Sequence, residues 1–185
     1  PGVTRPRCLQ PPEGKAAEAA RAHRAPLPVL ETERLTLRPA TLEDFPVWEA
    51  LFLGGDFKGN SETAWDEFCV YTAGWLLHGH GLLAVVARDT EKTVGFVLLG
   101  LEWDDYEPEL GWMLAADARG HGFATEAAAA LRDHALDLFG SGGFVSYVYA
   151  RNKPSCAVAE RLGAADEGEI PGERGTRLYR HGRKS

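Results

Sequence analysis

A glycine-rich turn between an apolar strand and an alanine-rich helix constrains the fold of this chain more than any other feature. The apolar run ELGWML (109–114) precedes Gly120 and Gly122, after which Ala127 and Leu131 belong to a helical repeat of apolar side chains. Glycines at such a turn permit backbone conformations that a β-carbon blocks, so their N–H groups can point at an anion. The positive end of the following helix lies beside them. This arrangement predicts a pyrophosphate-binding turn in an α/β domain.

The other apolar patterns supply the strands and helices of a mixed sheet. Thr41 stands three residues before Asp44, the spacing of a helix N-cap, and two β-branched runs are joined by the polar loop RDTEK, as in an antiparallel hairpin. We expect a first strand around Leu35, Leu37 and Arg38, which Pro39 cannot continue as an interior strand. Further strands are expected at 82–87, 93–101, 109–114, 144–150 and 176–180, with one more before the last, and helices at about 41–54, 61–76, 122–139 and 154–162. The predicted fold class is therefore α/β, with a mixed, largely antiparallel central sheet of about seven strands flanked by about four helices.

Residues 1–28 differ in kind from the rest of the chain. They hold six prolines and five basic against two acidic residues, and their middle, EGKAAEAARAHR, contains no large apolar side chain. Such a segment cannot bury a core of its own, so we interpret it as a Pro/Ala-rich basic N-terminal tail that is helical only transiently. The domain proper is expected at residues 29–185.

Composition narrows the class of protein. Of the 185 residues, 44% are hydrophobic, which suits one domain with an ordinary core. No apolar run approaches the roughly 18 residues that cross a bilayer, and the N-terminal segment lacks the apolar stretch of a secretory signal. The three cysteines, Cys8, Cys69 and Cys156, are widely spaced without a CxxC pair, so neither a disulfide framework nor a zinc site is indicated. We expect a cytoplasmic protein with reduced thiols and no membrane association.

The charge distribution indicates the kind of partner. The net charge is −7 although the tail is basic, so the domain itself is strongly acidic. An acidic surface repels nucleic-acid phosphates and attracts cations, which favours amine partners and argues against nucleic acid, with salt-dependent binding through the tail as the alternative. His78 and His80 flank Gly79 without a third ligand at usable spacing, so no metal is expected.

Two familiar phosphate-binding motifs are excluded at the turn. A P-loop needs lysine and then serine or threonine after its second glycine, but Phe123 and Ala124 follow Gly122. A dinucleotide-binding fingerprint needs a third glycine where Thr125 stands. Arg119 adds a fixed positive charge that suits phosphate oxygens. The turn therefore predicts a pyrophosphate ligand of another kind.

At these residues the chain resembles the GNAT superfamily of acetyl-coenzyme A-dependent N-acetyltransferases. Arg119, Gly122 and Ala124 occupy the three specified positions of that family's Q/R-x-x-G-x-G/A signature. The resemblance covers about residues 29–182. Within the superfamily, the chain is similar to the branch of ribosomal-protein-alanine N-acetyltransferases. It is carried further by LETERLTLRP (30–39), ELGWML (109–114), ATEA (124–127) and the spacing from Asn152 to Leu162–Gly163.

The resemblance implies acetyl-coenzyme A as co-substrate, without a metal, and it also implies where acetyl-coenzyme A would bind. In that family the fourth strand and the next, parallel strand splay apart, and the pantetheine arm lies between them like an added strand. Backbone groups of Met113 and Leu114 would pair with the arm, and Asn152 and Ser155 would lie beside it, unless both only cap the short helix. The pyrophosphate would lie on the turn residues Arg119, Gly120, His121, Gly122, Phe123, Ala124 and Thr125.

The resemblance also implies the reaction, which is direct transfer of the acetyl group to a primary amine in a ternary complex. The acceptor would be a protein N-terminus or a small-molecule amine. Such transfer needs an uncharged nitrogen and a route for its proton. Glu109, at the head of the fourth strand, matches an acidic position near the acceptor site and is the candidate catalytic base. The alternative is an exposed carboxylate at a strand end.

Acidic and aromatic side chains alternate in the loop before Glu109. They are suited to attract a cationic amine, although a solvated loop has the same composition. The residues are Glu102, Trp103, Asp104, Asp105, Tyr106 and Glu107.

One departure from the family pattern concerns the departing thiolate. Many members place a tyrosine seven residues after the asparagine, but Ala159 stands there. No general acid is assigned, and a non-catalytic acyl-coenzyme A-binding module of the same fold stays as the alternative function. The oligomeric state is left open, with a homodimer allowed.

Overall fold

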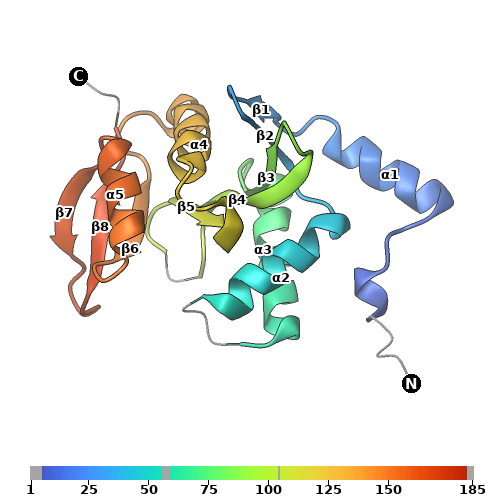
Figure 1. The fold of residues 1–185 in the computed structure, drawn as a ribbon, viewed down its shortest axis with the longest axis horizontal. Coiled ribbons are helices and arrows are strands. Elements are labelled where there is room, and N and C mark those ends of the chain that lie inside the picture. Colours follow the sequence, from blue (N-terminus) through green and yellow to red (C-terminus); the bar gives the residue numbers. More distant parts are fainter. Residues whose placement is uncertain (1–5, 56–58, 104, 183–185) are drawn as a thin grey trace.

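Apolar side chains on both faces of the strands produce a sheet that helices cover on two sides. In the computed structural model, which describes residues 6–55, 59–103 and 105–182, eight strands form one sheet in the order β1-β2-β3-β4-β5-β6-β8-β7 (Figure 1). All neighbouring strands are antiparallel except β5 and β6. The strands are β1 (Leu30–Glu31), β2 (Leu35–Pro39), β3 (Leu82–Ala87), β4 (Lys92–Gly100), β5 (Glu109–Leu114), β6 (Val145–Tyr149), β7 (Ala165–Glu169) and β8 (Thr176–Arg180).

The mixed, largely antiparallel fold class is confirmed. The first predicted strand, β2, extends through Pro39, which pairs with Leu83, so the expected end before Pro39 is wrong. The additional short strand β1 precedes it because Thr32 turns the chain: its N–H donates to the carbonyl of Leu35, and its Oγ accepts the N–H of Leu35 at 3.0 Å. A helix within the tail adds one to the expected number. The helices are α1 (Gly14–Arg24), α2 (Phe45–Gly54), α3 (Ser61–Leu77), α4 (Phe123–Phe139) and α5 (Lys153–Arg161).

The predicted cap at Thr41 is present and leads into a buried ion pair. Thr41 and Asp44 form a capping box. The Asp44 carboxylate also accepts hydrogen bonds from both Nη atoms of Arg38, at 2.7 and 2.9 Å. The hydroxyl of Thr93 on β4 donates to the same carboxylate at 2.6 Å. Burial alone would raise the pKa of Asp44, but these hydrogen bonds outweigh it and hold the pKa below its usual value. The cluster therefore fixes the start of α2 against β2 and β4.

Two hydrophobic clusters cover the two faces of the sheet. On one face, α4 packs Leu131 against side chains such as Val97 and Leu110. On the other face, α2 and α3 pack Trp48 and Phe68 around Phe96, with Trp48 and Phe96 in an edge-to-face pair at 5.3 Å. This two-sided burial explains why β3 and β4 read as continuous apolar runs rather than alternating ones.

The parallel pair β5–β6 joins the two halves of the sheet at a single point. β5 pairs with β4 along its whole length, but with β6 only at Glu109↔Val145. Figure 1 shows β6, β8 and β7 as a group beside the β1–β5 half. We call the divergence of β5 and β6 beyond this pair the fork. The C-terminal end of β5 leads from the fork into the glycine-rich turn and α4.

Helix α1 lies at the far end of the molecule in Figure 1, and none of its residues is buried. Leu27 and Leu30, by contrast, pack against the core cluster on the α4 side. The helix in the tail is thus a defined element without a buried face, while residues 1–5 lie outside the described part of the chain. A domain boundary at residue 28 stays a prediction. Among the described residues, no helix combines the length and apolarity needed to span a membrane.

Candidate functional site

The glycine-rich turn adopts backbone conformations that favour glycine. Gly120 and Gly122 have φ values of +82° and +81°. A β-carbon on Gly120 would meet no atom within 4 Å, and one on Gly122 would meet only Nη2 of Arg34, at 3.5 Å. Backbone conformation, rather than lack of space, therefore demands glycine here. Gly122 is also the N-cap residue of α4, so the turn ends directly at the positive end of that helix.

The N–H groups of this turn are available to an anion. Within the described part of the chain, Arg119 donates its N–H to Ala116, but the N–H groups of residues 120–125 have no acceptor. The hydroxyl of Thr125 is buried without a partner as well. Free N–H groups at a helix N-terminus, with an unpaired hydroxyl beside them, fit the oxygens of a pyrophosphate. The turn thus has the donor set that the sequence predicts.

An arginine clamp that sequence reasoning missed holds the turn in place. Nε of Arg34 donates to the Glu126 carboxylate at 2.8 Å, and Nη1 donates to the carbonyl of His121 at 2.9 Å. The guanidinium also lies 4.7 Å from the ring centroid of Phe123. Thr32 donates its hydroxyl to the same carboxylate at 2.6 Å. The ring of Phe123 therefore faces the clamp, and the clamp contacts His121 through its backbone carbonyl.

The sequence position of Glu126 could have indicated a role in this clamp. It lies in the ATEA segment in the first turn of α4, where an acidic side chain is favourable. Burial would raise its pKa, but hydrogen bonds from Thr32 and Arg34 outweigh burial, so the pKa of Glu126 lies below its usual value. The carboxylate is therefore ionised at neutral pH and pairs with the guanidinium.

The register of β5 decides which of its backbone groups face the fork. The carbonyl of Met113 lies against Gly95 of β4, where an added β-carbon would stand 2.1 Å from it. Because backbone groups alternate between the two neighbours of a strand, Met113 faces β4, whereas Trp112 and Leu114 face the fork. Nε of Arg119 donates to the carbonyl of Leu114 at 3.1 Å. Of the two residues expected to pair with a ligand, Leu114 faces the fork and Met113 faces β4, and Trp112 faces the fork as well.

Asn152 and Ser155 lie at the start of α5, after β6. The Asn152 carbonyl oxygen accepts the N–H of Ser155 at 3.2 Å, so Asn152 is the N-cap and Ser155 is capped by it. The capping interpretation of Asn152 is thus correct, while its amide NH2 and the Ser155 hydroxyl have no partner among the described residues.

Glu109 lies where β5 and β6 meet. The backbone N–H of Tyr147 on β6 lies near its carboxylate and favours the charged form. Burial, with smaller contributions from the carboxylates of Asp105 and Glu102, raises the pKa of Glu109 to about 8 against the opposing effect of the Tyr147 N–H. Glu109 is therefore a half-buried carboxyl group that gains and loses a proton near neutral pH, not an exposed strand-end charge.

The acidic and aromatic loop is more structured than a solvated loop. Tyr71 of α3 donates its hydroxyl to the Glu102 carboxylate in a short hydrogen bond. Glu107 is engaged elsewhere, in an ion pair with Arg180 at 2.5 Å. The side chains of Trp103 and Tyr106 are 99% and 96% exposed. Asp104 lies outside the described residues.

The members of this acidic group that lie around Glu109 come from separate parts of the chain. Burial raises the pKa of Glu67 on α3, and Glu102 raises it further. The hydroxyl of Tyr71 is held protonated at neutral pH, because burial and the carboxylate of Glu102 raise its pKa far above the usual value. Sequence analysis missed Glu67 and Tyr71, because residues at helical spacing are usually interpreted as side chains that pack the helix against the core. We call Glu67, Tyr71, Glu102, Asp105 and Glu109 the acidic group.

Two further sequence expectations concern a general acid and a metal. Ala159, at the position where many relatives carry tyrosine, is fully buried in a small cluster with Tyr179. His78 and His80 stack with ring centroids 5.6 Å apart, and His80 is buried. Within the described ranges, no group of three or more His, Cys, Asp or Glu side chains has the arrangement of a metal site.

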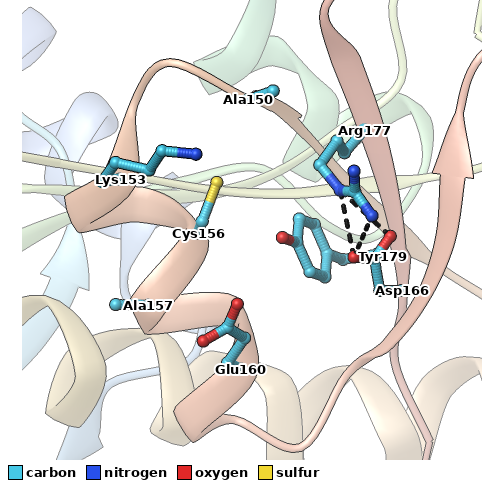
Figure 2. A pocket seen from close by; sticks show the side chains of 8 residues that line it. All are labelled: Ala150, Lys153, Cys156, Ala157, Glu160, Asp166, Arg177 and Tyr179. Carbon is cyan, nitrogen blue, oxygen red and sulfur yellow. Dashed lines mark hydrogen bonds and ion pairs between the residues drawn. The ribbon is translucent and has the colours of Figure 1, made fainter.

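A separate cavity of about 390 Å³ lies between α5 and strands β7 and β8 (Figure 2). An ion pair between Asp166 and Arg177 forms part of its wall. None of the predicted site residues lines this cavity, so it is distinct from the fork and the turn. Its lining residues are Ala150, Lys153, Cys156, Ala157, Glu160, Asp166, Arg177 and Tyr179.

Comparison with known proteins agrees with this geometry. The family described as "Acetyltransferase (GNAT) domain" matches residues 34–165. An acetyltransferase structure from Agrobacterium tumefaciens is 35% identical with a TM-score of 0.76, covering 85% of this chain and 95% of that one. A GnaT-family acetyltransferase from Bordetella pertussis is 25% identical with a TM-score of 0.72, covering 84% and 99%.

A structural likeness at lower identity extends to RimL, a ribosomal L7/L12 alpha-N-protein acetyltransferase whose structure contains coenzyme A. It is 18% identical with a TM-score of 0.67, and the match covers 83% of this chain and 97% of that one. At this identity the likeness concerns the fold. No curated protein sequence gave a significant match.

Proposed function

The chain belongs to the GNAT family of acetyl-coenzyme A-dependent acetyltransferases, and we propose that it transfers the acetyl group directly to a primary amine in a ternary complex. The observation that carries this proposal is the meeting of three features along β5. The anion-binding turn follows its C-terminal end, the fork opens along its side, and Glu109 stands at its start. The strand thus connects the phosphate end of the site with its reactive end.

Acetyl-coenzyme A would be held along this strand. The N–H groups of residues 120–125 and the hydroxyl of Thr125 would bind the pyrophosphate. The backbone groups of Trp112 and Leu114 that face the fork would pair with the pantetheine arm, as a neighbouring strand does. Asn152 and Ser155 supply donors from the β6 side. When bound, acetyl-coenzyme A supplies an activated acetyl group at its thioester.

Glu109 is the proposed base. An attacking amine must lose a proton as its nitrogen forms the bond to the acetyl carbon and the carbon–sulfur bond breaks. A carboxylate with a pKa near 8 accepts a proton far better than an ordinary glutamate, which is too weak a base. The Tyr147 N–H beside this carboxylate favours its charged form and partly opposes the rise of its pKa. No protein side chain is assigned to protonate the thiolate, and solvent is an adequate donor for it.

The acceptor is proposed to be a cationic amine that reaches the acidic group. Negative side chains from α3, the loop and β5 converge around Glu109, and burial together with repulsion between carboxylates raises the pKa values of Glu67 and Glu109. The exposed rings of Trp103 and Tyr106 border the same loop and suit contact with an ammonium group. A protein N-terminus and a small-molecule amine both satisfy this chemistry.

The testing experiment is a panel of amines assayed by thiol release from acetyl-coenzyme A. The panel should contain short peptides with different N-terminal residues, diamines and neutral hydroxyl compounds as controls. Turnover with amines and none with the hydroxyl compounds is the expected result. Tight binding of acetyl-coenzyme A without turnover on any amine would instead support the non-catalytic binding module, the alternative that Ala159 keeps open.

A further inference from the structure

The fork leaves two backbone groups without the partners that a regular parallel ladder would give them. Val145 donates its N–H to the carbonyl of Pro108 at 3.0 Å, which is the last regular step beside the pair Glu109↔Val145. In the next step of a parallel ladder, the N–H of Tyr147 would donate to the carbonyl of Leu110. The strands diverge here, and no such bond is made among the described residues.

Side chains satisfy both groups instead. The hydroxyl of Ser146 donates to the carbonyl of Leu110 at 2.6 Å. The carboxylate of Glu109 lies near the N–H of Tyr147, which favours its charged form. Ser146 is 1% exposed, so its bond lies in the protein interior, where an unpaired carbonyl would be costly. Each strand therefore contributes one side chain that replaces the missing backbone bond of the other.

A buried histidine fixes the Ser146 hydroxyl. Nε2 of His181 lies 2.8 Å from Oγ of Ser146, and the imidazole stacks on Phe144 with a centroid distance of 5.3 Å and an interplanar angle of 9°. A carbonyl can only accept, so the hydroxyl proton points at Leu110 and Nε2 must carry the hydrogen that donates to Ser146. Nδ1 then has a buried lone pair without a partner.

This arrangement keeps His181 neutral. Burial lowers the pKa of His181 to about 4, and the charge of Arg132 acts in the same direction. A second ring proton on Nδ1 would have no acceptor. The histidine is therefore a fixed donor at neutral pH rather than a switch, and the chain His181–Ser146–Leu110 is a permanent strut at the base of the fork.

We propose that Ser146 and His181 are positioning residues that set the point at which β5 and β6 separate, and thereby keep Glu109 beside Tyr147 and the fork open to the acyl carrier. This inference rests on the proposed function for its catalytic consequence. Its structural part stands separately. Without the strut, Leu110 recovers a partner only if Tyr147 moves to it, which restores one step of the ladder, narrows the fork and releases the Glu109 carboxylate.

Ser146→Ala tests the proposal. We expect affinity for coenzyme A, measured by calorimetry, to fall about tenfold, the effect of losing one buried hydrogen bond. We also expect the acidic limb of the pH–rate profile to move to higher pH, because Glu109 loses the donor that favours its charged form. The groups that also face Glu109, and that the variant leaves in place, are Asp105 and Glu102 of the loop, Tyr71 and Glu67 of α3, and Tyr147 of β6.

A readout without catalysis follows the same bond. In the unaltered protein the amide proton of Tyr147 should shift in NMR spectra as Glu109 titrates, with a midpoint near 8. In Ser146→Ala this titration should disappear. An unchanged titration together with unchanged coenzyme A affinity would overturn the proposal. If the unaltered protein turns over no amine while these two changes occur, the strut stands and the proposed function fails.

Matched variants separate positioning from stability. Thr176→Val removes another buried hydroxyl, on β8 opposite Tyr149, and should change neither readout. Ser146→Thr keeps the hydroxyl and should retain the Tyr147 titration. His181→Phe keeps the stack on Phe144 but removes the donor to Ser146, so the same changes should appear at smaller size. If Ser146→Ala does not fold, these last two variants carry the test, and equal behaviour of His181→Phe and the unaltered protein would contradict the role of His181.

Discussion

The two ends of β5 are built in different ways. At the C-terminal end, the turn around Gly120 and Gly122 binds through its backbone, and its shape depends on two positive φ angles and the start of α4. At the N-terminal end, Glu109 is surrounded by side chains from α3, the loop and β6. A backbone site needs only the right local conformation, whereas a side-chain site needs the whole fold. The first end should therefore fail when its geometry is lost, and the second when a charge is altered.

The largest effect should come from Gly122→Val. A β-branched residue at φ +81° is strongly disfavoured, so the turn would have to change shape and withdraw its N–H groups from the anion. Coenzyme A binding should become undetectable by calorimetry, a loss of at least about a hundredfold.

Gly140→Val is the matched control for that variant. Gly140 follows the other end of α4 with a φ of +74°, and a β-carbon there would meet no atom within 4 Å. With a ψ of −177° its backbone strain on substitution is at least as large, but it lies away from the turn. Normal coenzyme A affinity in Gly122→Val, or equal losses in both variants, would break the claim that this end binds through its backbone.

Glu109→Gln should affect the other end. The amide cannot accept a proton, so we expect kcat to fall by about a hundredfold or more, the usual range for loss of a general base, while coenzyme A affinity stays within about twofold. Asp89→Asn, an exposed change of the same charge in the β3–β4 turn, is the control. Equal losses of kcat and of coenzyme A affinity in Glu109→Gln would show that the two ends are not separate.

Arg34→Ala sharpens the comparison of the two ends of β5. Arg34 holds the glycine-rich turn in place but is not one of the turn residues. Removing the clamp on His121 and Glu126 should weaken coenzyme A binding about tenfold, with kcat at saturation unchanged. Arg88 donates to the carbonyl of Thr32 in the same region and gives a control, Arg88→Ala, in which affinity should be retained. If kcat falls in Arg34→Ala and affinity does not, the clamp serves the reactive end.

The smallest effect is expected from Trp103→Ala. An exposed ring contributes about 0.5–1 kcal/mol to contact with a cation, so KM for the amine should rise roughly two- to fivefold without a change in coenzyme A affinity. Leu77→Ala, an exposed apolar change at the end of α3, should leave both values unchanged. An unchanged KM for every amine that the enzyme accepts would remove Trp103 from the acceptor site.

The same contrast explains what the sequence could predict. Glycines before an alanine-rich helix predict the turn, because the same few residues set its backbone conformation and supply its N–H donors. Most elements follow from apolar periodicity, and the family resemblance adds the fork. The sequence does not show which backbone groups of β5 face the fork, because that depends on the hydrogen bonds between β5 and β4. The sequence therefore did not show that Met113 faces β4 whereas Trp112 faces the fork.

Contacts between distant segments account for the rest. Arg34 and Glu126 meet across the fold, as do Tyr71 and Glu102, and no local pattern relates the members of either pair. Glu107 was grouped with the acidic loop by composition, but its partner Arg180 comes from the last strand. The pKa of Glu109 depends on burial that only the assembled sheet provides. Sequence could nominate Glu109 through the family resemblance, but not its raised pKa.

The central claim is that ionisation of Glu109 controls acetyl transfer at the side-chain end of β5. The most direct measurement is kcat against pH at saturating acetyl-coenzyme A and amine, for the unaltered protein and for Glu109→Gln. A carboxyl group whose pKa is raised to about 8 is mostly protonated below that pH, so kcat should rise with pH through a midpoint near 8 and level off above it. The variant should retain only a low rate without this midpoint. The same midpoint in both proteins would contradict the account.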